Sequence, residues 1–253
     1  MYYVELLYAR TRFLWYTAIC LGIAAVFSYF VSFPPAGAHI ENNGQDIPLD
    51  VVLLFASFIA MIMSSMLAAT LNRDQSHLSF IWTKPVARER IALSYMLVDV
   101  TTIILSYFVL FIVIAGVLAI PPQNHMITGP MTGSVLARAI AVPLMAYAVV
   151  EVATSWSPVR LAAAQGLWWP VGIALLFLSE VRFPFPIAQL VTLVNFLNPL
   201  AYLPESRGHV VNVEFVQGAH PLTLGFDTTT IIAYCIFIAG CVIAIYNWKR
   251  MEA

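Results

Sequence analysis

The chain has 253 residues, of which 61% are hydrophobic and 10% are charged, and its formal net charge is −1. Soluble globular proteins are about half apolar and about a quarter charged, so this composition indicates an integral membrane protein instead. The small net charge argues neither for nor against nucleic acid, and we expect no nucleic-acid partner. The three cysteines lie inside apolar runs without metal-ligand spacing, so we expect packing residues and no metal site.

Six apolar segments predict membrane-spanning helices, because crossing a bilayer core of about 30 Å takes roughly 20 mostly apolar residues. In chain order they cover residues 13–33, 51–71, 91–120, 135–154, 162–181 and 229–246. The first could instead be a signal peptide, since Ala36-Gly37-Ala38 resembles a cleavage site. It is longer than the usual signal core of about 7–15 residues, so we expect an uncleaved helix. Residues 1–12 mix tyrosines and leucines with charges and predict a short interfacial helix before it.

The residues before the last span are the least regular part of the chain. Residues 183–204 are apolar and free of charge but have prolines at both ends, and a polar stretch follows up to residue 228. A full seventh span is the alternative, and it would move the C-terminal Lys249 and Arg250 to the outer side. A re-entrant or interfacial helical segment fits better, since broken backbone at membrane depth must be buried in protein or line water. We therefore expect an external, re-entrant region over residues 182–228.

The distribution of basic residues predicts the orientation. With both termini in the cytoplasm, nine of the twelve Lys and Arg residues lie on the inner side and three on the outer side, as the positive-inside rule requires. The inner ones are Arg10, Arg12, Arg73, Lys84, Arg88, Arg90, Arg160, Lys249 and Arg250; the outer ones are Arg138, Arg182 and Arg207. The expected fold is a single all-α membrane domain over residues 1–253 with six transmembrane helices, in the plasma membrane (the inner membrane of a bacterium).

Catalytic signatures are missing from the chain. It contains no HExxH zinc motif, no GxSxG nucleophile elbow and no GxxxxGK[ST] phosphate loop, and its five histidines are scattered. Two carboxylates are possible intramembrane polar residues, which are costly and often functional. Asp99 lies two turns into the third span, either as a helix-interface or conduit carboxylate or near the headgroups if that helix begins outside the hydrocarbon. Glu151, near the inner end of the fourth span, is expected to be interfacial.

The segment 73–90, RDQSHLSFIWTKPVARER, is a basic connection between the second and third spans. Leu78, Ile81 and Trp82 recur at spacings of three and four within it, which predicts one or two helical turns with an apolar face before Pro85 ends them. Such a helix can lie on the membrane surface or in a groove of a partner protein.

This segment resembles the cytoplasmic connection of ABC-2-type (type V exporter-like) transporter permeases. That family has an acidic residue, a small pair, an apolar run and T-x-P-[VI]-x-R, and the NPLAYL of residues 198–203 is similar to the family's wording before the last span. The matching positions here are Asp74, Ser76-His77, Leu78 to Trp82, and Thr83 to Arg88. The family often has Gly-Thr where Ser76-His77 stand and Gly-Lys where Ser94-Tyr95 stand, so no subfamily is assigned.

The resemblance implies a non-enzymatic permease subunit of an exporter that forms a homodimer, or a pseudo-symmetric heterodimer, in the lipid membrane and binds a separate cytoplasmic ABC ATPase. The chain carries no cofactor in this interpretation, and ATP and Mg²⁺ belong to the ATPase. Leu78 and Trp82 would be buried anchors in the ATPase, and the remaining partner-binding residues would fix the register. These remaining residues are Asp74, His77, Lys84 and Arg88.

Two other functions remain open from the sequence. A structural or assembly subunit of another membrane complex could use the same amphipathic segment to dock on a different partner. A membrane-embedded enzyme acting on lipid would need a cluster of polar catalytic residues near one face, and the sequence offers only dispersed ones.

Overall fold

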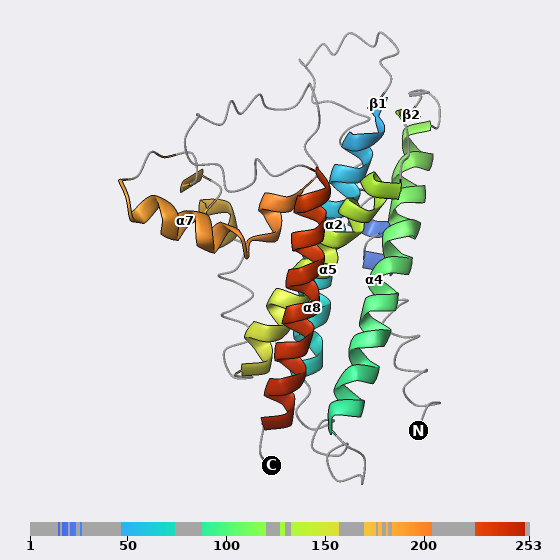
Figure 1. Ribbon diagram of the computed structural model, residues 1–253. Helices are drawn as coiled ribbons and strands as arrows, with labels where there is room; N and C mark the ends of the chain where they lie inside the picture. The colour runs from blue at the N-terminus through green and yellow to red at the C-terminus, as the bar shows by residue number, and fades with distance from the viewer. Residues whose placement is uncertain are drawn as a thin grey trace.

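Most of the described residues belong to four long helices, which run alongside one another in a bundle (Figure 1). The computed structural model describes residues 15, 17–19, 21–23, 26, 47–73, 88–119, 127–129, 133–156, 170–175, 177–178, 181, 184–203 and 226–250. The long helices are α2 (Leu49–Arg73), α4 (Arg88–Ala119), α5 (Gly133–Trp156) and α8 (Phe226–Arg250). The short elements are strands β1 (Ile47–Pro48) and β2 (Ile127–Thr128), helix α7 (Ile187–Asn195) and the 3-10 helix η2 (Pro199–Tyr202).

Three of these helices are long and apolar enough to cross a membrane, namely Glu89–Leu118, Gly133–Ser155 and Thr228–Arg250. Helix α2 has 25 residues and carries a shorter apolar stretch, Val52–Ala68. The predicted helical character is therefore confirmed, and the three long apolar helices are compatible with a membrane-embedded protein. Of the first and fifth expected spans, the structure describes helical residues between 15 and 26 and between 170 and 178, and the rest lie outside the described residues.

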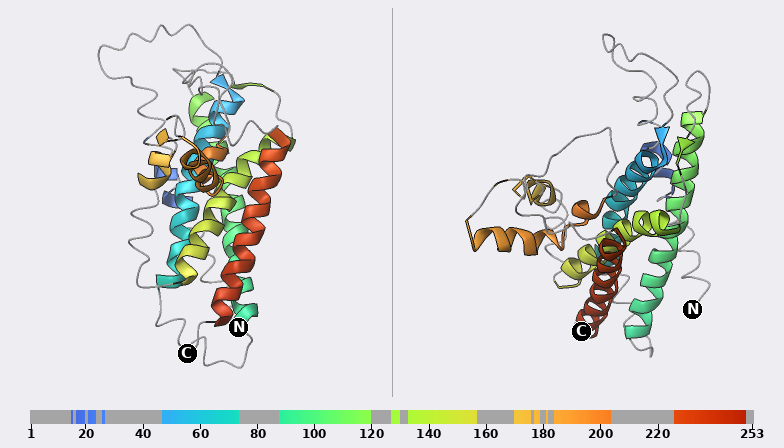
Figure 2. Two further views of the ribbon diagram at one scale, coloured as in Figure 1. Left: turned by 60° about the vertical axis from the view of Figure 1, so that its left-hand side comes forward. Right: turned by 45° about the horizontal axis from the view of Figure 1, so that its top comes forward.

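Helix α5 is the centre of the bundle (Figure 2). All residues from 141 to 148 are buried, so neighbours cover this part of the helix on every side. Three of these eight residues are alanines, and small side chains let neighbouring backbones approach closely. The closest approach lies between Ala148 and Gly240 of α8, where a Cβ added to the glycine would lie 2.9 Å from the Ala148 Cβ. Glycine is therefore required where α5 and α8 cross.

Hydrogen bonds from side chains of α2 and α8 to carbonyl groups of α5 add to this packing. The Ser57 hydroxyl of α2 donates to the Ala139 carbonyl at 3.0 Å, and the Tyr234 hydroxyl of α8 donates to the Ala137 carbonyl at 3.0 Å. Pro143 follows these two residues in α5 and has no N–H, so the carbonyl of Ala139 lacks its helical donor. The Ser57 hydroxyl replaces that donor and fixes α2 against α5.

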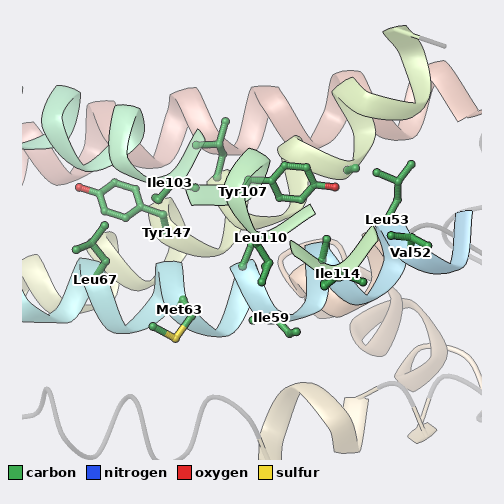
Figure 3. Close-up of a cluster of buried hydrophobic side chains, with 14 of the residues drawn as sticks. Val52, Leu53, Ile59, Met63, Leu67, Ile103, Tyr107, Leu110, Ile114 and Tyr147 are labelled. Carbon is green, nitrogen blue, oxygen red and sulfur yellow. The ribbon is translucent and has the colours of Figure 1, made fainter. Parts of the chain in front are cut away.

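The largest apolar cluster fills the space between α2, α4 and α5 (Figure 3). Two tyrosines lie within it, Tyr107 from α4 and Tyr147 from α5, and their hydroxyl groups point in opposite directions along the bundle. The Tyr147 hydroxyl points toward the Leu67 end of α2, whereas the Tyr107 hydroxyl points toward the Leu53 end. The Leu67 end is the one at which α4 begins.

Strands β1 and β2 pair in parallel at the opposite end of the bundle, with Ile47 beside Ile127 and Pro48 beside Thr128. Both strands lie between expected spans, at positions that six spans with cytoplasmic termini would place on the outer side. Gly129 follows β2 with a φ of 133°, and a Cβ there would lie 3.3 Å from the Leu49 Cβ, so glycine is required at this turn.

Helix α7 lies across the direction of the long helices (Figure 1, Figure 2). It has nine residues, about 14 Å at a rise of about 1.5 Å per residue, and is too short to cross a bilayer. Residues 196–203 continue as a turn and the 3-10 helix η2. The described residues 184–203 are therefore broken helix, as the prolines predicted, and not one continuous span.

Candidate functional site

A cluster of buried polar side chains lies inside the bundle, between α4, α5 and α8. Asp99 of α4 is 1% exposed and Glu151 of α5 is 0% exposed. The Tyr147 hydroxyl donates a hydrogen bond to Asp99 Oδ2 at 3.1 Å, which links α4 to the central helix. The structure thus brings together the two carboxylates that the sequence selected, and it places Glu151 within the protein interior rather than on the surface of the bundle.

The spacing along α5 explains why Tyr147 and Glu151 belong to one cluster. Residues four apart lie on the same face of a helix, one turn from each other. Asp99 and Glu151 both interact electrostatically with Tyr147, as does Cys241 of α8, and Glu151 also interacts with Cys241. The cluster therefore connects three helices at one level of the bundle.

Carboxyl groups are costly to bury inside a bundle of apolar helices, so the presence of Asp99 and Glu151 there indicates a structural or functional role. The arrangement can hold α4 in register with α5, and its acidic groups can accept hydrogen bonds. Within the described residues, no group of three or more His, Cys, Asp or Glu side chains could hold a metal ion. Tyr147 was not identified from the sequence as a donor to Asp99. Its four-residue spacing from Glu151 could have shown that the two share a helix face.

A second set of contacts joins the end of α8 to the start of α4. Trp248 is buried in a small cluster with Ile91, Ala92 and Tyr95. Lys249 Nζ lies 2.7 Å from Glu89 Oε1, and both side chains are exposed, so water screens this ion pair and it contributes little to stability. Burial of the large Trp248 ring contributes more, because Trp-to-Ala changes in cores cost about 3–5 kcal/mol.

The predicted partner-binding segment connects helices that end at this same part of the bundle. Helix α2 ends at Arg73 and α4 begins at Arg88, next to the end of α8 (Figure 1). Arg88 is therefore the first residue of α4. The other predicted partner-binding residues lie outside the described residues, and these are Asp74, His77, Leu78, Trp82 and Lys84.

A polar joint around Asn198 holds the segment after α7. The Asn198 side-chain amide donates to the Gly172 carbonyl and to Asn195 Oδ1, each at 3.0 Å, and its oxygen accepts from the Leu200 amide at 3.3 Å. A Cβ on Gly172 would lie 3.2 Å from Asn198 Oδ1, so the glycine allows this close contact. The Tyr202 hydroxyl donates to the Phe196 carbonyl at 2.9 Å.

Arg138 adds a bond from the central helix, since its Nη2 donates to the Leu203 carbonyl at 3.4 Å. The structure assigns a packing or hydrogen-bonding role to most residues of the NPLAYL stretch. Asn198 caps η2, Pro199 starts it, and Leu200 and Tyr202 are buried against the bundle.

Comparison with known proteins gives no match: no protein-family model, no curated protein and no solved structure is similar to this chain.

Proposed function

We propose that this chain is the membrane-spanning permease subunit of an ATP-driven exporter of the ABC-2 type. In this proposal, the chain crosses the membrane six times with both termini in the cytoplasm, residues 182–228 form an external re-entrant region, and two copies, or two related chains, assemble as a dimer. A separate ATPase docks on residues 73–90 and drives substrate translocation.

One observation supports the proposal most strongly: basic residues collect at the end of the bundle where α2 and α4 are joined. Of the six Lys and Arg residues in the described part of the chain, Arg138 alone lies elsewhere. The other five end α2, begin α4 or end α8, and they are Arg73, Arg88, Arg90, Lys249 and Arg250. This is the pattern of a cytoplasmic face, so the segment 74–87 would be presented to a cytoplasmic partner.

The contacts around this end suit a mechanical connection. Trp248 packs against Ile91 and Tyr95, so the beginning of α4 is fixed to α8. Further along α4, Asp99 is bonded to Tyr147 of the central helix. A partner that displaces the segment 74–87 would move α4, and these contacts would pass the displacement to α5 and α8.

The test replaces Trp82 by alanine and measures the co-purifying ATPase and its ATP hydrolysis in membrane vesicles. We expect Trp82→Ala to remove most of the bound ATPase or most of its stimulation, because buried aromatic anchors contribute about 2 kcal/mol or more to an interface. Trp15→Ala is the matched control, since Trp15 lies on the first helix and its side chain is exposed. Normal binding and normal hydrolysis in Trp82→Ala would refute the docking role of this segment.

The orientation is tested separately by the reaction of single cysteines with an impermeant thiol reagent. Cysteines at Asn42 and Gln217 should react in intact cells, whereas a cysteine at Ser76 should react only after lysis. The reverse pattern would overturn the proposed topology while leaving the helical bundle unchanged.

A further inference from the structure

Helix α7 buries its polar residue Asn195 and exposes several large apolar side chains, with Gln189 also exposed. Asn195 is 3% exposed and takes part in the Asn198 joint, whereas Leu190 and Leu193 are 64% and 66% exposed. We call the exposed apolar side chains of α7 and its flanks the outward row. They are Phe185, Ile187, Leu190, Leu193, Val194 and Leu197. Large apolar side chains exposed together on one short segment mark a site of contact with an apolar partner.

The level at which α7 leaves the bundle is set by η2, which follows it after three residues. Leu200 and Tyr202 of η2 share a buried cluster with Met61 of α2 and Met145 of α5. Both methionines lie at the middle of their helices, about 12 residues or about 18 Å from either end. Figure 1 and Figure 2 show α7 extending sideways from this region. A bilayer surrounding the long helices would have its acyl chains at this level.

The backbone N–H groups at the start of α7 find their hydrogen-bond acceptors within the protein. A helix ordinarily leaves its first four N–H groups without partners. Here the amides of Ile187 and Ala188 donate to the Pro184 carbonyl at 2.9 and 3.3 Å. The amides of Gln189 and Leu190 donate to the Pro186 carbonyl at 3.1 and 3.2 Å, and neither proline has an N–H of its own. Such internal satisfaction is what hydrocarbon demands of a backbone.

The absence of charge in residues 183–204 favours a position among the acyl chains over one at the headgroups. Residues 183–204 contain no Asp, Glu, Lys, Arg or His. Helices that lie at the level of the headgroups carry a strongly charged face, which α7 lacks.

We propose that the outward row of α7 is a lipid-binding surface that contacts the acyl chains of the bilayer. A second protein copy fits this row less well, because a stable protein interface uses roughly 20–30 residues on each side and the row has six. The assignment goes beyond the proposed transport function and holds whichever partner binds residues 73–90.

The test measures which small reagents reach a nitroxide label on α7 in phosphatidylcholine vesicles. The full chain with its three cysteines replaced by alanine receives one cysteine, by Leu193→Cys, for labelling. Electron paramagnetic resonance then compares collisions with oxygen, which concentrates among acyl chains, and with a water-soluble nickel chelate. Leu105→Cys on the exposed face of α4 is the lipid control, and Gly133→Cys at the exposed start of α5 is the water control.

We expect the oxygen-to-nickel collision ratio at Leu193 to match that at Leu105 and to exceed that at Gly133 several-fold. Nickel access at Leu193 equal to that at Gly133 would overturn the proposal, because the row would then face water. Low access to both reagents at Leu193 would also overturn it, in favour of a second protein copy covering the row. Nickel access at Leu105 as well would contradict the membrane-spanning role of α4 itself.

Discussion

Replacing Gly240 by alanine tests how closely α5 and α8 approach each other. A Cβ at this position would lie 2.9 Å from the Ala148 Cβ and 3.3 Å from the Ala148 carbonyl carbon and oxygen. Carbon atoms in optimal contact are about 3.5–4.0 Å apart, so the helices would have to separate by roughly half an ångström or more. Alanine has no side-chain rotation that could relieve the contact. Overpacking of this kind costs about 1–3 kcal/mol.

Gly116→Ala is the matched control, because a Cβ at Gly116 of α4 meets no atom within 4 Å. Each substitution gains about 1 kcal/mol of helix propensity, so the difference between the two variants isolates the steric cost. Reversible unfolding in mixed micelles, followed by circular dichroism against the mole fraction of dodecyl sulfate, measures that difference. We expect Gly240→Ala to be the less stable variant by about 1–3 kcal/mol. Equal free energies of unfolding would refute the close crossing of α5 and α8.

Three further substitutions test other contacts of the bundle. Tyr147→Phe removes one hydrogen-bond donor to the buried Asp99 carboxyl and should lower the free energy of unfolding by about 1–3 kcal/mol, and an unchanged value in the same titration would argue against this bond. Asn198→Ala removes the joint that holds the end of α7, so the α7 amides should exchange their hydrogens faster by mass spectrometry; unchanged exchange would contradict the joint. Leu193→Asp places a charge among acyl chains, which costs about 2.5–3.5 kcal/mol of insertion free energy. It should lower the amount of folded protein in membranes as much as Leu105→Asp does. Normal amounts of folded protein would be inconsistent with lipid contact.

The positions of the long helices could be predicted because a bilayer leaves helices as the practical way to bury long apolar runs. The expected span 91–120 corresponds to α4 (Arg88–Ala119), and 135–154 corresponds to α5 (Gly133–Trp156). Helix α8 continues to Arg250, beyond the apolar run that ends at Tyr246. A helix need not end where hydrophobicity ends, and contacts such as those of Trp248 with α4 extend it.

The candidate sites were less predictable because they depend on contacts between distant residues. The spacing of Tyr147 and Glu151 shows that they share a face of α5, but not that α4 brings Asp99 to that face. The prolines around residues 183–204 predicted broken helix. They could not predict that Asn198 turns inward to Gly172, since that bond joins residues 26 positions apart.

Photo-crosslinking from residues 73–90 in living cells tests the proposal that this segment binds a separate ATPase. A photoreactive amino acid at Trp82, followed by purification and mass spectrometry, identifies the protein that contacts this position. We predict one dominant crosslinked partner with a phosphate-binding loop of the GxxxxGK[ST] kind, and no crosslink to it from the same amino acid at Trp15. A different partner at position 82, or none, would rule out an ATPase docked on this segment.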